Sequence, residues 1–326
     1  MMYLVTGGAG FIGSNTVSHL LELGERVRVL DNFATGKRQS LFPLEDRVEL
    51  VEGDIRYLNV VQEAMKGVDY VIHLAALPSV PRSIRTPIES NDVNITGTLN
   101  VLMAARDAGV KRVVYAASSS AYGNTEVMPK VETMAALPLS PYAVNKFAGE
   151  LYCRVFHNVY GLETVALRYF NVFGPRQDPM SQYSAVIPKF IGATLSGKAP
   201  VIYGDGEQSR DFTYVDNVVS ANLLACKAQG ASGETINIAC GSRVSLNELV
   251  QIIGKLTGNP MKPIYETTRT GDVKHSLADI GKASRLLGYL PNIGLEEGLR
   301  RTVEWLRDTE EQPERRRASS LGSGKE

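Results

Sequence analysis

Few of the residues that mark secreted, metal-binding or membrane proteins occur in this sequence. Its three cysteines, Cys153, Cys226 and Cys240, are odd in number and widely spaced, so we expect reduced thiols and neither a disulfide framework nor a zinc site. The four histidines lack the His-Glu-x-x-His spacing, and no metal is predicted. No stretch approaches the ~18 apolar residues of a membrane span, and the first residues lack the pattern of a signal peptide. These absences predict a cytoplasmic protein with no membrane contact.

An excess of charge of either sign is also absent. Lys+Arg and Asp+Glu each number 35, so the net charge of zero gives no overall attraction to nucleic acid. Hydrophobic residues make up 44% and charged residues 21% of the chain, a balance typical of globular proteins and not of disordered ones. At roughly 150 residues per domain, 326 residues predict two structural lobes.

Strand-like and helix-like segments alternate through residues 1–170. Short β-branched runs at 3–6, 26–30, 48–52, 70–74, 112–117 and 164–168 predict strands, and the periodicity of 11–23, 58–65, 94–108 and 142–160 predicts helices. This alternation is typical of an α/β fold with a doubly wound parallel (Rossmann) sheet. We expect residues 1–170, with a return segment near 212–240, to form a nucleotide-binding domain.

The pattern changes after Tyr169, where prolines and a Gly-Asp-Gly turn interrupt it. We expect residues 171–309 to form mainly a smaller, partly discontinuous C-terminal substrate-binding lobe. The segment Ser245-Leu246-Asn247-Glu248 has the form of a capping box that opens a helix. Residues 310–326 are charged and lack apolar periodicity, which predicts a disordered tail.

A glycine-rich turn follows the first predicted strand and precedes a helix. Glycines at positions 7, 10 and 13 permit close approach to a pyrophosphate, and the helix amino terminus offers free N–H groups. Asp31 ends the second predicted strand, where a carboxylate binds the adenosine ribose and would repel a 2′-phosphate, so NAD is favoured over NADP. The predicted cofactor-binding residues here are Gly7, Gly10, Phe11, Ile12, Gly13, Asp31, Asn32, Asp54, Ile55 and Ala75. His73 also lies at a strand end, where a structural role is equally compatible with its position.

A second cluster has the residue types of a proton-transfer site. Ser118 ends the fifth predicted strand, and Tyr142 and Lys146 lie on one face of the next helix. The ammonium is expected to lower the phenol pKa from about 10, and the serine hydroxyl to share a hydrogen bond with a substrate hydroxyl. We predict Ser118, Tyr142 and Lys146 as catalytic residues, with Tyr142 and Lys146 also contacting the cofactor. Ser119 and Ser120 could share the serine's task.

Taken together, these motifs resemble the sugar-nucleotide 4-epimerases of the extended short-chain dehydrogenase/reductase family. The resemblance extends from Met2 to about Leu306 and is carried by residues 6–13, Leu30-Asp31-Asn32, Tyr142-x-x-x-Lys146 and the Arg-Tyr-Phe-Asn-Val-Phe-Gly-Pro run at 168–175. It implies that dehydratases carry Asp-Glu, and decarboxylases a Glu, where this chain has Ser119 and Ser120. Epimerisation is the chemistry that remains. In it, the Tyr142 phenolate takes the proton of the sugar 4-hydroxyl while C4 passes hydride to NAD⁺, and the rotated 4-keto sugar regains the hydride on its other face.

The resemblance also places a UDP-sugar in the second lobe. It implies that Arg210 and Arg269 hold the diphosphate, Asp272 the uridine ribose, and Asn171 the diphosphate or sugar. Ser276 falls where a bulky aromatic limits relatives to UDP-glucose and UDP-galactose, so its small size predicts room for an N-acetyl group. The predicted substrate-binding residues are Ser79, Ser119, Ser120, Asn171, Gln177, Arg210, Arg269, Asp272 and Ser276.

We therefore expect an NAD-dependent isomerase, closest to the UDP-N-acetylglucosamine 4-epimerase group, that interconverts UDP-GlcNAc and UDP-GalNAc and also UDP-Glc and UDP-Gal. Gln177 is expected to bind the acetamido group, and Asp178, where relatives that epimerise UDP-glucuronate carry an Arg, is expected to repel a uronate. The alternatives are a UDP-glucuronate 4-epimerase, an oxidoreductase with net redox output, and a non-enzymatic NAD-sensing regulator. A homodimer through helices 94–108 and 142–160 is implied by the resemblance, although their apolar faces could equally be covered within the chain.

Overall fold

The computed structural model describes residues 1–178, 185–268 and 274–322 and contains one large parallel sheet. Its seven strands lie in the order β11-β6-β5-β4-β1-β2-β3, and every neighbouring pair is parallel. The strands are β1 (Met2–Thr6), β2 (Arg26–Asp31), β3 (Glu49–Glu52), β4 (Tyr70–His73), β5 (Arg112–Ser118), β6 (Thr164–Tyr169) and β11 (Thr235–Ile238). The chain order reverses between β1 and β4, and ligands bind at such a switch point in doubly wound sheets.

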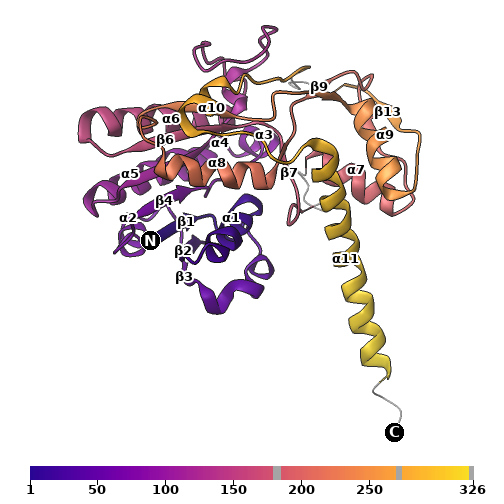
Figure 1. Cartoon of the computed structure of the whole chain (residues 1–326), viewed down its shortest axis with the longest axis horizontal. Helices are drawn as coiled ribbons and strands as arrows, with labels where there is room; N and C mark the ends of the chain where they lie inside the picture. Colours follow the sequence, from indigo (N-terminus) through magenta and orange to yellow (C-terminus); the bar gives the residue numbers. More distant parts are fainter. Residues whose placement is uncertain (179–184, 269–273, 323–326) are drawn as a thin grey trace.

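Helices cover both faces of this sheet (Figure 1). Two buried apolar clusters, one on each face, hold the three layers together because β-branched residues of the central strands are buried on both sides. On one face lie α1 (Phe11–Glu22), α8 (Val215–Lys227) and α10 (Gly281–Leu287); on the other lie α2 (Leu58–Ala64), α5 (Gly97–Asp107) and α6 (Pro141–Tyr160). This arrangement confirms the predicted doubly wound fold, including the return strand β11 after the first 170 residues.

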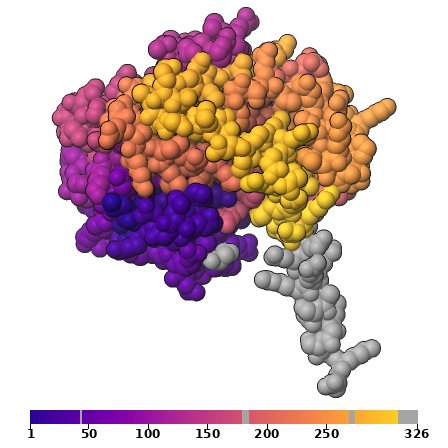
Figure 2. Space-filling view, viewed as in Figure 1, coloured from indigo at the N-terminus to yellow at the C-terminus, as the bar shows by residue number. Residues whose placement is uncertain are grey.

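A smaller lobe packs beside the carboxyl ends of the strands (Figures 1 and 2). It has its own apolar cluster and contains α7 (Val186–Leu195), α9 (Leu246–Thr257), the β8–β13 pair (Val201–Tyr203 with Ile264–Glu266) and α11 (Leu295–Gly322). Ser245 caps α9 in the predicted capping box with Glu248. Short strand pairs join the lobe to the region after β6: β7 (Val172–Phe173) with β10 (Thr213–Tyr214), and β9 (Ser209–Arg210) with β12 (Val244–Ser245).

Two local predictions differ from the structure. Residues 310–322 continue α11 instead of forming an irregular tail, because Glu, Arg, Ala and Gln are good helix formers even without an apolar face. The helix predicted over 94–108 is not one regular α-helix. It begins with a π-helical turn, Asp92–Thr96, and continues as α5.

Among the described residues, no helix is long and apolar enough to cross a membrane. All three cysteines are free thiols, as expected.

Candidate functional site

The glycine turn lies between β1 and α1 and is too tight for side chains. Gly7 has φ +70°, and a Cβ there would lie 2.7 Å from the Ala75 backbone nitrogen. A Cβ on Gly13 would lie 2.1 Å from the Gly7 carbonyl oxygen. The first N–H groups of α1 have no partner within the helix, and no side chain caps them. The turn therefore forms a bare backbone cradle of the kind that accepts a pyrophosphate.

Asp31 lies beside this cradle at the end of β2. Its Oδ2 accepts a hydrogen bond from the Ala9 N–H at 2.9 Å, and its Oδ1 accepts one from the Phe33 N–H at 2.8 Å. Burial raises the pKa of Asp31 although both hydrogen bonds lower it. Next to it, Asn32 donates to Asp54 Oδ2 at 2.9 Å, which joins the ends of β2 and β3. These predicted residues thus share one edge of the sheet.

Residues 174–178, which follow β7, contact α1 and the loop after β2. Arg176 donates to the Ser14 carbonyl oxygen at 2.6 Å, and Asp178 forms an ion pair with Lys37 at 2.7 Å. Lys37 in turn donates its backbone N–H to Ala9 in the glycine turn. The positive charge of Lys37 thus lies against the negative charge of Asp178, whose expected repulsion of a uronate stays a prediction.

The cradle, the helix amino terminus and the carboxylate of Asp31 together fit an adenine dinucleotide. Gly7, Gly10 and Gly13 leave room for the diphosphate, Phe11 and Ile12 begin the helix that faces it, and Asp31 stands at the ribose position. Ala75 lies directly against Gly7, while Ile55 is buried against Gly97 in one of the two apolar clusters of the sheet.

The three predicted catalytic residues come from β5 and α6. Ser118 ends β5, where its Oγ accepts hydrogen bonds from the N–H and hydroxyl of Ser120, at 3.2 and 2.8 Å. Ser119 lies in the same 3₁₀ turn, Ser119–Tyr122. Tyr142 hydrogen-bonds Ser118 and is fixed at its own backbone N–H by the Ser83 hydroxyl, at 3.0 Å. Lys146 lies one turn farther along α6 and donates to the Ala116 carbonyl oxygen at 2.8 Å.

The charge states differ from the prediction. Burial raises the pKa of Tyr142, although the hydrogen bond with Ser118 lowers it. The same burial lowers the pKa of Lys146 to about 8, because a desolvated ammonium is disfavoured. The net shift of the phenol pKa is therefore upward, opposite to the direction expected from the helical spacing, because burial dominates it.

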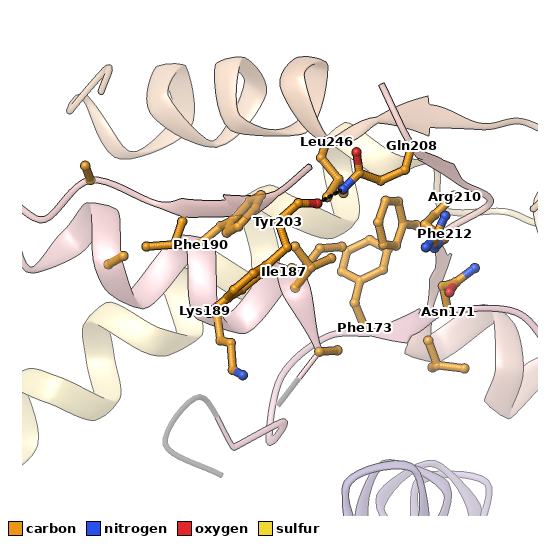
Figure 3. Close-up of a pocket in the computed structure, with 16 residues that line it drawn as sticks. Asn171, Phe173, Ile187, Lys189, Phe190, Tyr203, Gln208, Arg210, Phe212 and Leu246 are labelled. Atoms are coloured by element: carbon orange, nitrogen blue, oxygen red, sulfur yellow. Dashed lines mark hydrogen bonds between the residues drawn. The ribbon is translucent and has the colours of Figure 1, made fainter. Parts of the chain in front are cut away.

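A cavity of about 460 Å³ lies in the second lobe (Figure 3). Its walls are apolar and aromatic, and Gln208 lies over Tyr203, donating to its carbonyl oxygen at 2.7 Å. Asn171 and Arg210 lie at one side of the cavity, and Lys189 also lines it. The volume is in the range of small-molecule sites. Its lining includes Asn171, Phe173, Ile187, Lys189, Phe190, Tyr203, Gln208, Arg210, Phe212 and Leu246.

Several predicted substrate-binding residues meet at the Asn171 side of the cavity. The Asn171 amide donates to the Asp211 carbonyl oxygen at 2.8 Å and to Ser276 Oγ at 3.1 Å. Arg210 donates to the backbone carbonyls of Ser209 and Lys274, each at 3.0 Å. Sheet register brings this cluster near the serine turn, because Ser118 pairs with Tyr169, two residues before Asn171.

The other predicted substrate residues occupy different positions. Gln177 donates to the Val172 carbonyl oxygen at 3.3 Å, while its buried Oε1 has no partner among the described residues. Ser79 caps α3 (Val80–Arg85) by accepting from the Arg82 N–H, and its φ of 124° is rare for a residue with a side chain. Arg269 and Asp272 lie outside the described residues.

Three contributors to this region were not predicted. Lys37 holds the loop after β2, Ser83 fixes the start of α6, and buried Asn94 holds residue 77 by both its backbone groups, with Leu77 N–H donating at 2.8 Å. Each acts through a partner far away in the chain, so no local pattern could have revealed it. The described residues include no group of three or more His, Cys, Asp or Glu side chains placed as metal ligands.

The chain is similar in sequence and in structure to known 4-epimerases. A model of the NAD dependent epimerase/dehydratase family matches residues 3–239. The UDP-glucose 4-epimerase of Thermotoga maritima, solved with UDP-glucose, is 40% identical with a TM-score of 0.90 and covers 95% of this chain and 99% of its own. The UDP-N-acetylglucosamine 4-epimerase of Methanobrevibacter ruminantium, solved with UDP-N-acetylmuramic acid, is 43% identical with a TM-score of 0.90 and covers 94% and 98%.

A third relative, the UDP-glucuronate 4-epimerase of Thermodesulfobacterium geofontis, is 37% identical over 94% of this chain and 96% of its own length. Three sugar nucleotides are thus named among relatives of similar identity, and all three relatives are named as 4-epimerases. The chain belongs to the NAD dependent epimerase/dehydratase family, with NAD as its cofactor, and is an isomerase.

Proposed function

We propose that the protein epimerises a UDP-hexose at C4 and that its main reaction is the interconversion of UDP-GlcNAc and UDP-GalNAc. The observation that carries this proposal is the contact between Asn171 and Ser276 beside the second-lobe cavity. The cavity has the apolar and aromatic walls that suit a uracil base, with Arg210 at its edge as a cation for the diphosphate. Asn171 at the side of the cavity follows Tyr169 by two residues, and Tyr169 pairs with Ser118 in the sheet.

The chain's own residues supply the proton chemistry. Bound NAD supplies a hydride acceptor and donor at the sugar C4. Tyr142 takes the proton of the 4-hydroxyl and later returns it to the 4-keto oxygen, while Ser118 hydrogen-bonds that oxygen and Lys146 favours the phenolate once cofactor and substrate displace water. Ser119 and Ser120 lie close enough in the turn to contact the sugar.

The preference for an acetamido sugar rests on two side chains. Ser276 beside Asn171 has a small side chain, which would leave room there for a bulky 2-substituent where a phenol ring would not. Gln177 carries a buried oxygen without a partner among the described residues, and such an acceptor suits an amide N–H. By the same resemblance, Arg269 would hold the diphosphate, Asp272 the uridine ribose, and Ser79 would border the hexose.

Exchange of Ser276 tests this preference. Ser276→Tyr should lower kcat/KM for UDP-GlcNAc by roughly 10²-fold or more, because a phenol fills the acetyl space, and should leave UDP-glucose turnover within a few fold. Ser276→Ala is the matched control, since it keeps the space and removes only the hydroxyl. Equal loss of both activities in Ser276→Tyr, or an unchanged ratio of the two, would contradict the proposal.

We also propose that the protein forms a homodimer through α6. Val144, Leu151, Val155 and Val159 repeat along one face of this helix and are 39–66% exposed. An apolar helix face of this kind is stabilised when a two-fold axis brings a second copy against it.

A further inference from the structure

His73 ends β4 and pairs with Thr6, the residue before the glycine turn, yet the proposed proton chemistry does not use it. Its ring is almost completely buried, at 1% exposure, and lies 5.7 Å from the ring of Tyr115. Thr6 and Thr98 lie on either side of the imidazole and are equally buried. Burial and the nearby Lys146 lower the pKa of His73 to about 3, so the imidazole is neutral at physiological pH.

Counting protons assigns the tautomer of this imidazole. The Thr98 hydroxyl donates its one proton to the Asn94 carbonyl oxygen at 2.7 Å, so towards His73 Nε2, 3.1 Å away, it acts as an acceptor. The Tyr115 hydroxyl also contacts Thr98, but it donates its own proton to the Lys146 carbonyl oxygen at 3.3 Å, so it leaves Thr98 as the acceptor towards His73. Nε2 therefore carries the hydrogen, and Nδ1 is an acceptor.

The other side of the ring gives the same assignment. Thr6 Oγ1 lies 2.7 Å from His73 Nδ1 and accepts a hydrogen bond from the Ala75 N–H at 3.2 Å. With Nδ1 as an acceptor, the Thr6 hydroxyl donates to His73 and accepts from Ala75, so both of its roles are used. With a hydrogen on Nδ1, the Thr6 proton would lack an acceptor among the described residues. The bonds therefore run in one direction from Ala75 through Thr6, His73 and Thr98 to Asn94.

The two ends of this series of hydrogen bonds lie at Ala75 and, through Asn94, at Leu77. Ala75 lies directly on the glycine turn, where a Cβ on Gly7 would approach its nitrogen to 2.7 Å. Asn94 binds both backbone groups of Leu77, accepting from its N–H at 2.8 Å and donating to its carbonyl at 3.2 Å. The buried imidazole thus adds a side-chain link between the glycine turn and residues 75–77 to the backbone bond from Leu74 N–H to the Thr6 carbonyl oxygen, at 3.1 Å.

We infer that His73, as its Nε2–H tautomer, is a positioning residue that holds residues 75–77 against the glycine turn and thereby sets how tightly NAD is retained. Of this series of hydrogen bonds, the half nearer the glycine turn comprises the acceptor Nδ1, Thr6 and Ala75. The donor Nε2 faces Thr98, on the side away from the glycine turn.

Two isosteric variants separate these halves. His73→Asn places an amide oxygen near the position of Nδ1 and keeps the acceptor for Thr6, whereas His73→Gln places an amide nitrogen near Nε2 and keeps the donor for Thr98. The rate at which bound NAD exchanges with labelled NAD is measured on each holoenzyme, with UDP binding by calorimetry on the same samples. His73→Gln should release NAD roughly tenfold faster, as expected for one lost buried hydrogen bond, and His73→Asn should stay within about threefold of the parent. UDP affinity should be unchanged in both.

Equal acceleration in the two variants, or faster release from His73→Asn, would overturn the inference. A tautomer measurement on the unmodified protein needs no variant to fold: the ¹⁵N spectrum of histidine-labelled enzyme should show the buried imidazole with hydrogen on Nε2 and a bare Nδ1. A hydrogen on Nδ1, or a charged ring at neutral pH, would also overturn it. Neither readout depends on which UDP-sugar is turned over, so the result is independent of the proposed substrate.

Discussion

At the scale of single residues, Tyr142 and Lys146 show what a motif predicts and what it leaves open. Their spacing placed both on one face of α6, and the structure confirms that placement. Their charge states depend on burial, which raises the pKa of the phenol and lowers that of the ammonium, so free Tyr142 is protonated. Bound substrate and cofactor must supply the remaining stabilisation of the phenolate.

Replacing Tyr142 by Phe removes the proton path and little else. Tyr142→Phe should lower kcat by roughly 10²–10⁴, the usual loss for a general acid–base, while bound NAD and UDP affinity stay near those of the parent. Tyr152→Phe on the same helix is the control and should keep normal turnover. A chromatographic assay of the UDP-sugar products, with NAD content measured on the same samples, decides the outcome; normal turnover in Tyr142→Phe would remove this residue from the mechanism.

At the scale of elements, the sequence predicted the strands and helices of the sheet well because each has a local period and local end signals. The π-helical turn before α5 and the contacts of Lys37 and Asn94 were missed, since they depend on partners brought near only by the fold. Asp211, between β9 and β10, is a further example: its carboxylate accepts from the N–H groups of Cys240, Gly241 and Ala278, which come from two other segments.

Asp211 should give the fold a measurable pH dependence. Burial raises its pKa to about 6, above the ordinary value of 3.8, so between these values the folded protein binds more protons than the unfolded chain. Stability from this group is present at low pH and lost as the pH rises through 6. Relative to Asp211→Asn, the free energy of unfolding should fall by about 2 kcal/mol from pH 4 to pH 7, since each pKa unit corresponds to about 1.4 kcal/mol and part of the change lies below pH 4. Urea titrations at each pH would reveal this change, and a gap that stays constant would contradict it.

At the scale of the whole molecule, the second lobe lies beside the carboxyl ends of the sheet strands (Figure 1), and α6 carries exposed apolar side chains along one face. The division into a nucleotide-binding domain and a smaller lobe follows from where the strand–helix alternation is interrupted, whereas the proposed subunit contact depends on a surface that local patterns do not distinguish from a buried one.

Charge placed on that face should separate the subunits. Val155→Asp, at a residue that is 46% exposed, should convert a dimer into a monomer in light scattering, because a carboxylate is costly to bury in an apolar contact. Leu23→Asp, 60% exposed at the end of α1, is the control and should leave the mass unchanged. A parent protein that is already monomeric would contradict the proposed dimer.

The most direct test of the account is to incubate the purified protein with UDP-GlcNAc and separate the products by chromatography. We predict a product of equal mass that coelutes with UDP-GalNAc, the same mixture when the reaction starts from UDP-GalNAc, and no release of NADH. Absence of that product, with conversion of UDP-glucuronate or UDP-glucose by the same sample, would contradict the proposed substrate. NADH accumulating in solution would contradict epimerisation itself.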